Sequence, residues 1–549
     1  MESSEPLMAA PPTEQKEFAV VIKDAADFDE IHEKIITDYG DDSIPNRQIE
    51  IANYRPGSER ITHYMLTEEE AVQLRTNPKI QSVEVPPHLN PRLKFTSLLK
   101  QDATFTKTST IIQSDVNWGL LRCTKTTDTW GSGVANSIGS YNYTLTGKGV
   151  DVVILDGGIT PNHPEWTDSN GVSRLQQIDW YTASGLAGTQ SANHYLDYDG
   201  HGSHVTSIAA GRTQGWARNS RIYFVKNSGL AGSEGGGISG SDMFDVIRLW
   251  HNNKPVDPNT GYKRPTVVNM SFGIVATEYS ASLPSVINYR GTNYNRGTDY
   301  TTLDQMKNNY GWMGFLSGGY YYHPYWSSTY EAEVQDMVNA GIHVVVAAGN
   351  YNLKIDVPGG DDYNNYWGGY ADSYYHRGSA PGTRYAVVVG NISTSYNSSL
   401  ETRSSSSESG PGVHVYAPGT YIMGVSSKDN AGTNKIVTDY SLTTVPSVLD
   451  SNYNMMKITG TSMAAPQVVG ILACLLELNP GLTPAQAKAW LINKSLKNMI
   501  YDTGGATSYN SSTSLTGGNN NFLFNPFNNS DDGKIQNGLT ILNGTLRLV

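Results

Sequence analysis

The sequence predicts an α/β protein whose parallel sheet is covered by helices on both faces. Short runs rich in Val and Ile alternate with helical segments from about residue 149 onward. Three of these runs are GVDVVILD (149–156), PTVVNMS (265–271) and IHVVVAAGN (342–350). Strands without polar alternation are typical of parallel sheets that are buried on both sides.

A small α+β domain is predicted before this sheet. Residues 1–90 hold 18 acidic and 8 basic side chains, a net charge of −10, so residues 91–549 carry only −2 of the total −12. The hydrophobic pattern within these 90 residues predicts the order βαββαβ, a ferredoxin-like arrangement. The predicted strands are 17–24, 47–53, 61–67 and 80–87, and the predicted helices are 25–38 and 67–77, the second opened by a capping box of Thr67 and Glu70. Residues 86 to about 115 are rich in Pro, Thr, Ser and Lys and are expected to form an exposed linker.

Composition excludes several classes of function. No cluster of Lys and Arg indicates nucleic-acid binding. The two cysteines, Cys123 and Cys474, are too few for a disulfide framework. The first residues lack a basic segment followed by an apolar one, and we find no run of about 18 apolar residues, so neither a Sec-exported nor a membrane protein is expected.

The stretch GTSMAAPQVVGILACLLEL (460–478) sets one hydroxyl, Ser462, before a helix that is apolar all round and therefore buried. Pro466 is expected in the first turn of that helix, where proline is tolerated. Ser462 has two interpretations: a helix cap, or a nucleophile facing the positive end of the helix.

Three other polar residues stand at predicted strand ends or helix starts, where sites in parallel sheets lie. Asp156 ends one strand, Asn350 follows another, and His201 opens a helix. Each has a plain explanation as a cap or turn residue. A metal site formed by His201 with His204, Asp197 and Asp199 is a further alternative, but no third ligand of metal type follows at helical spacing, so zinc is not expected. Together with Ser462 they supply the acid, base, amide donor and nucleophile of acyl transfer.

These segments resemble the subtilases, the subtilisin-like serine proteases. VVILDGGITPNHPEW resembles the Asp motif, GHGSHVTSIAAG the His motif, VVNMSFG and VVVAAGN the substrate-strand and oxyanion segments, and GTSMAAP the Ser motif. The resemblance runs from about residue 117 to about 491 and implies a subtilisin-like α/β fold with proteinase-K-like loop lengths. It implies a catalytic triad of Asp156, His201 and Ser462 with Asn350 as oxyanion donor. It also implies substrate contacts from Ser271, Phe272, Gly273, Ala347, Ala348 and Gly349, and a pocket for an apolar residue before the cut.

The N-terminal unit resembles the inhibitory propeptide of that family, which implies a self-processing zymogen. The expected division is a propeptide domain at 1–87, a linker at 88–115 and a protease domain at 116–549. Candidate residues preceding the cut are Leu89, Leu93, Phe95, Leu98, Leu99 and Phe105. The expected partners are a protein or peptide substrate and the chain's own propeptide, with neither nucleic acid nor membrane.

The sequence departs from the family pattern in places. Gly157 replaces the usual hydroxyl residue after the Asp, so weaker support of Asp156 is expected. The segment 201–226 resembles the shorter proteinase-K-like version, which lacks the calcium loop of subtilisin. No cofactor is therefore expected to be required and no metal ligand is predicted, although a structural calcium ion stays an open alternative. Two insertions, at about 274–329 and 427–454, and a Gly/Asn-rich extension at about 501–549 are added.

A second hypothesis is a structural protein that keeps the fold with its propeptide bound. The insertions and LWHNNKPVDPNTGYKRPTVVNMSFG resemble subtilase-like proteins of tailed bacteriophages. That resemblance implies a virion or an infected cell as the setting, with viral structural partners.

Overall fold

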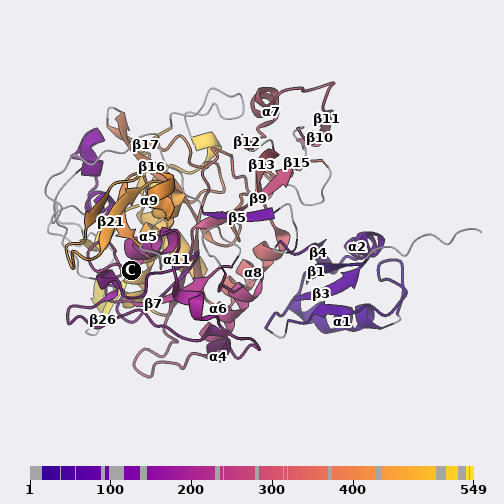
Figure 1. Ribbon diagram of the computed structural model, residues 1–549, viewed down its shortest axis with the longest axis horizontal. Coiled ribbons are helices and arrows are strands. Elements are labelled where there is room, and N and C mark those ends of the chain that lie inside the picture. The colour runs from indigo at the N-terminus through magenta and orange to yellow at the C-terminus, as the bar shows by residue number, and fades with distance from the viewer. Residues whose placement is uncertain are drawn as a thin grey trace, which may run out of the picture. The chain divides into compact units, whose positions relative to one another are not determined.

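The computed structural model describes most of the chain (Figure 1). The described residues are 15–37, 39–55, 57–87, 89, 93–97, 117–136, 145–228, 235–238, 240–278, 283–312, 314–317, 320–368, 374–397, 399–427, 435–502, 515–528, 539–542 and 545–548. The chain separates into two compact units, Met1–Asn90 and Pro91–Val549.

The N-terminal unit has the βαββαβ order that the sequence predicts. Its elements are β1 (Lys16–Ile22), α1 (Phe28–Ile36), β2 (Ile51–Asn53), β3 (Ile61–Leu66), α2 (Glu68–Arg75) and β4 (Ile80–Glu84). The strands form an antiparallel sheet in the order β2-β3-β1-β4. Thr67 and Glu70 form the predicted capping box at the start of α2.

A parallel sheet forms the centre of the second unit. Six strands run parallel in the order β18-β16-β14-β8-β6-β7. They are β6 (Asp151–Asp156), β7 (Arg221–Lys226), β8 (Thr266–Met270), β14 (His343–Ala347), β16 (Val387–Asn397) and β18 (Val415–Pro418). Every residue of β6, β8 and β14 is buried, so both faces of the sheet are covered, as predicted.

Shorter strands extend this sheet at one side. The antiparallel neighbour β17 (Leu400–Arg403) lies beside β16, and β23 (Ile500–Tyr501) lies beside β17. Beyond β18 follow β24 (Asn521–Phe522) and β22 (Leu496–Lys497). Part of the predicted C-terminal extension thus belongs to the central sheet, while its last described residues form the hairpin β25 (Leu539–Leu542) and β26 (Thr545–Leu548).

Helices cover the sheet in packed groups. α5 (His201–Ala210) packs against α10 (Thr461–Leu478), and α10 crosses β8, β14 and β16. α6 (Asp242–Asn253) packs against α8 (Ser328–Asn339) and α4 (Trp180–Ser184), and α8 contacts β14. Two further helices are α3 (Trp118–Arg122) and α11 (Pro484–Lys494).

Helix α10 begins one turn earlier than the sequence prediction. It starts at Thr461 after Gly460, so Pro466 lies inside the helix and not in its first turn. Proline has no N–H to bond the carbonyl four residues earlier, which is that of Ser462. The Ser271 hydroxyl donates to this carbonyl instead, at 2.9 Å, and so compensates for the missing bond.

Helix α10 is also, among the described residues, the single helix long and apolar enough to cross a membrane. Of its 18-residue window, 89% is buried inside the protein. This burial identifies it as the core helix of the second unit, as the apolar pattern predicted.

The prediction of an irregular linker after residue 86 was wrong for residues 93–97. Leu93–Ser97 form β5, which pairs antiparallel with β9 (Phe272–Glu278) (Figure 1). The partner is about 180 residues away in the sequence, so no local pattern marks this strand. Leu98, Leu99 and Phe105 lie outside the described residues.

The two predicted insertions have their own structure. The first continues from β9 through β10 (Val286–Tyr289), β11 (Thr292–Asn295), α7 (Leu303–Tyr310), β12 (Phe315–Ser317) and β13 (Tyr320–Tyr325), and β15 (Tyr366–Trp367) pairs with β10. The second holds α9 (Lys435–Asp439) and β20 (Thr444–Pro446), which joins β21 (Asn454–Ile458) and β19 (Ile422–Ser426) in a small antiparallel sheet.

Candidate active site

The four polar residues singled out in the sequence lie at ends of the central elements. Asp156 is the last residue of β6 and His201 the first of α5. Asn350 follows β14 by three residues, and Ser462 is the second residue of α10. The structure links them in two hydrogen-bonded groups, Asp156 with His201 and Asn350 with the start of α10.

Asp156 holds the imidazole of His201. The distance from His201 Nδ1 to Asp156 Oδ1 is 2.8 Å, and both side chains are fully buried. The same carboxylate oxygen accepts the Gly157 N–H at 2.7 Å. Among the described residues, Asp156 Oδ2 has no hydrogen-bond partner. This agrees with the weaker support expected from glycine at position 157.

The carboxylate changes the proton affinity of His201. Burial alone would lower the pKa of the imidazole, but the Asp156 charge and hydrogen bond outweigh burial and raise that pKa above its usual 6.5. Asp197 and Asp199 add to this effect from the loop before α5. His201 Nε2 has no hydrogen-bond partner among the described residues.

Ser462 is bound to the start of the predicted substrate strand. Its Oγ donates to the Ser271 carbonyl at 3.0 Å, and the Ser271 hydroxyl donates back to the Ser462 carbonyl at 2.9 Å. Ser462 makes no side-chain cap of α10. The capping interpretation of this serine is therefore wrong.

Asn350 is anchored through its oxygen. Asn350 Oδ1 accepts from the Thr461 N–H at 3.0 Å and from the Thr461 hydroxyl at 3.1 Å. Its amide nitrogen Nδ2 is buried without a partner within the described part of the chain. The two N–H groups on Asn350 Nδ2 are therefore left as donors beside Thr461, the residue that precedes Ser462.

The predicted substrate-binding residues flank this group. On β9, Phe272 lies opposite Ser97 and Gly273 opposite Thr96, so β5 occupies the edge expected to receive a peptide. Ala347 ends β14, and Ala348 and Gly349 lead from it to Asn350. Ala347 and Ala348 are fully buried.

Two neighbours of Asn350 escaped the sequence interpretation. Thr461 lies within the Ser motif, so its place beside Ser462 was a usable signal. No sequence signal marked Glu408, because it is about 60 residues from Asn350 in the chain. Its N–H donates to the Gly349 carbonyl at 3.1 Å, and its carboxyl accepts the N–H groups of Tyr351 and Leu353. Burial raises the pKa of Glu408 well above its usual range.

The second insertion lies against the loop before α5. The Ile436 N–H of α9 donates to the Asp199 carbonyl at 3.1 Å. His204, one turn along α5 from His201, places Nε2 3.1 Å from the Ile422 carbonyl oxygen and 3.2 Å from that of Met456. The contacts of His204 are thus with the small sheet of β19 and β21.

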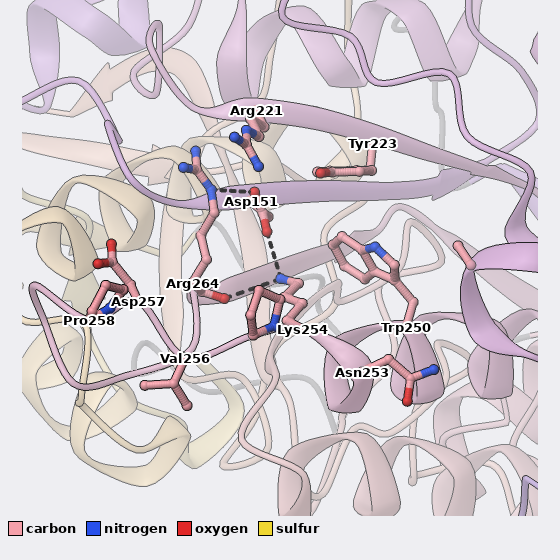
Figure 2. Close-up of a pocket in the computed structure, with 12 residues that line it drawn as sticks. Asp151, Arg221, Tyr223, Trp250, Asn253, Lys254, Val256, Asp257, Pro258 and Arg264 are labelled. Carbon is pink, nitrogen blue, oxygen red and sulfur yellow. Dashed lines mark hydrogen bonds and ion pairs between the residues drawn. The ribbon is translucent and has the colours of Figure 1, made fainter.

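A cavity of about 580 Å³ lies at the opposite end of the central strands (Figure 2). Asp151 and Arg221, which line it, are the first residues of β6 and β7. The Asp151 carboxylate pairs with Lys254 Nζ at 2.6 Å and Arg264 Nε at 2.5 Å (Figure 2). Because Asp156 ends the same strand that Asp151 begins, this cavity is separate from the candidate active site.

The family model described as the Subtilase family, Peptidase_S8, matches residues 147–524. The chain belongs to the subtilase family. This match contains Asp156, His201, Asn350 and Ser462.

Curated relatives are similar to this subtilase over most of its length. The extracellular serine proteinase of Thermus sp. strain Rt41A is 25% identical over 395 residues, 72% of this chain and 65% of that protein. Alkaline serine exoprotease A of Vibrio alginolyticus is 23% identical, over 80% of this chain and 56% of that protein. The subtilase thus matches less than two thirds of the length of these relatives. Among solved structures, fervidolysin of Fervidobacterium pennivorans has a TM-score of 0.48 at 17% identity, covering 96% of this chain and 62% of that chain.

The raised pKa of His201 can be measured directly. In a histidine NMR titration of the Ser462→Ala protein, His201 should titrate above pH 6.5. With Asp156→Asn added, its pKa should fall, because the charge and the hydrogen bond that most strongly oppose the effect of burial are then lost. His204, whose pKa burial lowers to about 3, serves as the internal control and should change in neither protein. An unchanged His201 midpoint would show that Asp156 does not set its proton affinity.

Proposed function

We propose that this subtilase is a serine endopeptidase that hydrolyses peptide bonds and is made as a self-processing zymogen. The observation that carries the proposal is the buried Asp156–His201 hydrogen bond, together with a His201 Nε2 that has no partner in the part of the chain that the structure describes. A buried carboxylate on Nδ1 fixes the tautomer in which Nε2 can accept a proton.

In the proposed reaction Ser462 is the nucleophile. Its hydroxyl leaves the Ser271 carbonyl and gives its proton to His201 Nε2 as Oγ attacks the substrate carbonyl carbon. His201 then protonates the leaving amine, and a water molecule releases the acyl group by the same steps in reverse. Asp156 stabilises the imidazolium that forms, which agrees with the raised pKa of His201.

We assign the stabilisation of the substrate oxyanion to two hydrogen-bond donors, the Asn350 side-chain amide and the Ser462 backbone N–H. The two bonds from Thr461 to Asn350 Oδ1 turn the Nδ2 donors away from the helix, so they need not reorganise when charge develops on the substrate oxygen. Ser271, Phe272 and Gly273 are assigned to the substrate backbone, and Ala347, Ala348 and Gly349 to the wall of the pocket for an apolar residue before the cut. All these groups belong to the protein, so we propose that the reaction requires no cofactor.

The proposed zymogen cut lies between Leu98 and Leu99. β5 runs antiparallel to β9, from Leu93 opposite Ala276 to Ser97 opposite Phe272, and therefore heads toward Ser271. Ser271 is hydrogen-bonded to Ser462. A substrate segment that continued this register by one residue would set Leu98, one of the apolar candidates from the sequence, opposite Ser271. The first substrate would then be the chain's own linker.

The protease proposal is tested with a fluorophosphonate probe. We expect covalent labelling of Ser462 in the wild-type protein, because only an activated serine hydroxyl reacts readily. Ser462→Ala and His201→Ala should not be labelled. Retained labelling in His201→Ala would contradict the assigned base, and a silent wild type would favour the structural, virion-associated alternative.

Replacing Asn350 tests the oxyanion assignment. Asn350→Ala should lower kcat roughly 100- to 1,000-fold with a much smaller change in KM, because the donor acts mainly in the transition state. Peptide hydrolysis rates over a range of substrate concentrations measure both constants. If only KM rose, Asn350 would be assigned to ordinary substrate binding.

The cut is tested by intact mass. The wild-type protein should separate between Leu98 and Leu99, while Ser462→Ala should remain whole. Leu98→Asp should block or displace the cut, because a charged side chain enters an apolar pocket at a desolvation cost. Leu89→Asp and Phe105→Asp are matched controls that should leave it in place. A cut that persists in Ser462→Ala would mean that another protease processes the chain.

A further inference from the structure

The edge of β9 that β5 occupies is longer than the three residues assigned above. β9 pairs with β5 from Phe272 to Ala276, over five residues. Its other edge pairs with β13, from Ile274 opposite Tyr325 to Glu278 opposite Tyr321. The strand is thus the centre of a four-stranded sheet in the order β12-β13-β9-β5.

Two observations show which backbone groups of β9 face β5. The Ile274 N–H donates to the Ser379 carbonyl at 3.0 Å, and therefore points away from β5. Pro324, which has no N–H, lies opposite Val275 on the other edge, as expected where β9 and β13 exchange no hydrogen bond. In a strand, neighbouring residues direct their backbone polar groups to opposite edges. Gly273 and Val275 therefore present their N–H and C=O groups toward β5, where Thr96 and Lys94 are their partners.

The outer half of this edge is built by the first insertion. Ile274 is buried in the main core of the second unit. Ala276, two residues further, is buried in a separate cluster with Trp312 of the insertion and Trp367 of β15. The insertion and β15 therefore anchor β9 beyond Ile274, where Val275 stays paired in the sheet.

We propose that the peptide-binding edge extends to Val275, so that substrates bind as extended strands with backbone pairing at the third and the fifth residue before the cut. The inference rests on the proposed function and deepens it: the substrate class is a peptide or unfolded segment able to extend over at least five residues on that side. With the cut after Leu98, Thr96 is the third residue and Lys94 the fifth.

The experiment uses the full chain after its processing has gone to completion. The parent substrate is the acetylated p-nitroanilide of residues 93–98, Leu-Lys-Phe-Thr-Ser-Leu. One analogue is N-methylated at the fifth position before the cut, which removes the N–H that would donate to the Val275 carbonyl. The matched control is N-methylated at the sixth position, whose N–H points away from β9. A shorter substrate ends at the fourth position.

We expect methylation at the fifth position to lower kcat/KM roughly threefold to tenfold, the value of one hydrogen bond. Methylation at the sixth position should change it less than about twofold. The Val275→Ala protein should show the same pattern, because the bonds use the backbone. Equal kcat/KM for the parent, both analogues and the shorter substrate would overturn the inference and end the edge at Gly273. Failure to hydrolyse even the shorter substrate would instead remove the protease proposal, and the inference with it.

Discussion

The reciprocal pair of hydrogen bonds between Ser271 and Ser462 joins the two halves of the candidate active site. One bond exists because Pro466 cannot donate to the Ser462 carbonyl, which leaves that carbonyl open to the Ser271 hydroxyl. The other bond holds the Ser462 hydroxyl against the Ser271 carbonyl. Since Thr461 binds Asn350 in the same turn, the start of α10 fixes the positions of β9 and of the residues after β14 together. A proline in the second turn of a helix therefore positions the start of β9 next to Ser462.

Local patterns predicted the parts of the fold that depend on neighbouring residues. The buried strands β6, β8 and β14 were predictable from their apolar runs, and α2 from its capping box. The same patterns located Asp156 at a strand end and His201 at a helix start. These features depend on segments of about ten residues, which is the range over which hydrophobic periodicity acts.

What could not be predicted depends on partners far away in the chain. β5 has no strand signal of its own, because its pairing energy comes from the exposed edge of β9. The start of α10 was placed too late because proline was expected only in a first turn, and the Ser271 hydroxyl that compensates is about 190 residues distant. Glu408 holds the backbone on both sides of Asn350, and it too could not be predicted because it is distant from Asn350 in the sequence.

The two acids before His201, Asp197 and Asp199, cap the start of α5. His201 begins α5, where the positive end of the helix disfavours an imidazolium, and its burial has the same effect. Asp197 accepts the N–H groups of Gly200 and Ser203, and Asp199 accepts that of His201, so both carboxyls cap the first turn of the helix. Burial raises the pKa of each, that of Asp199 to about 8. When these carboxyls are ionised, their negative charge offsets the positive potential at the N-terminal end of α5. Asp156 is the largest of the charges that raise the pKa of His201, and it keeps the imidazolium accessible at a position where burial and the helix end would otherwise suppress it.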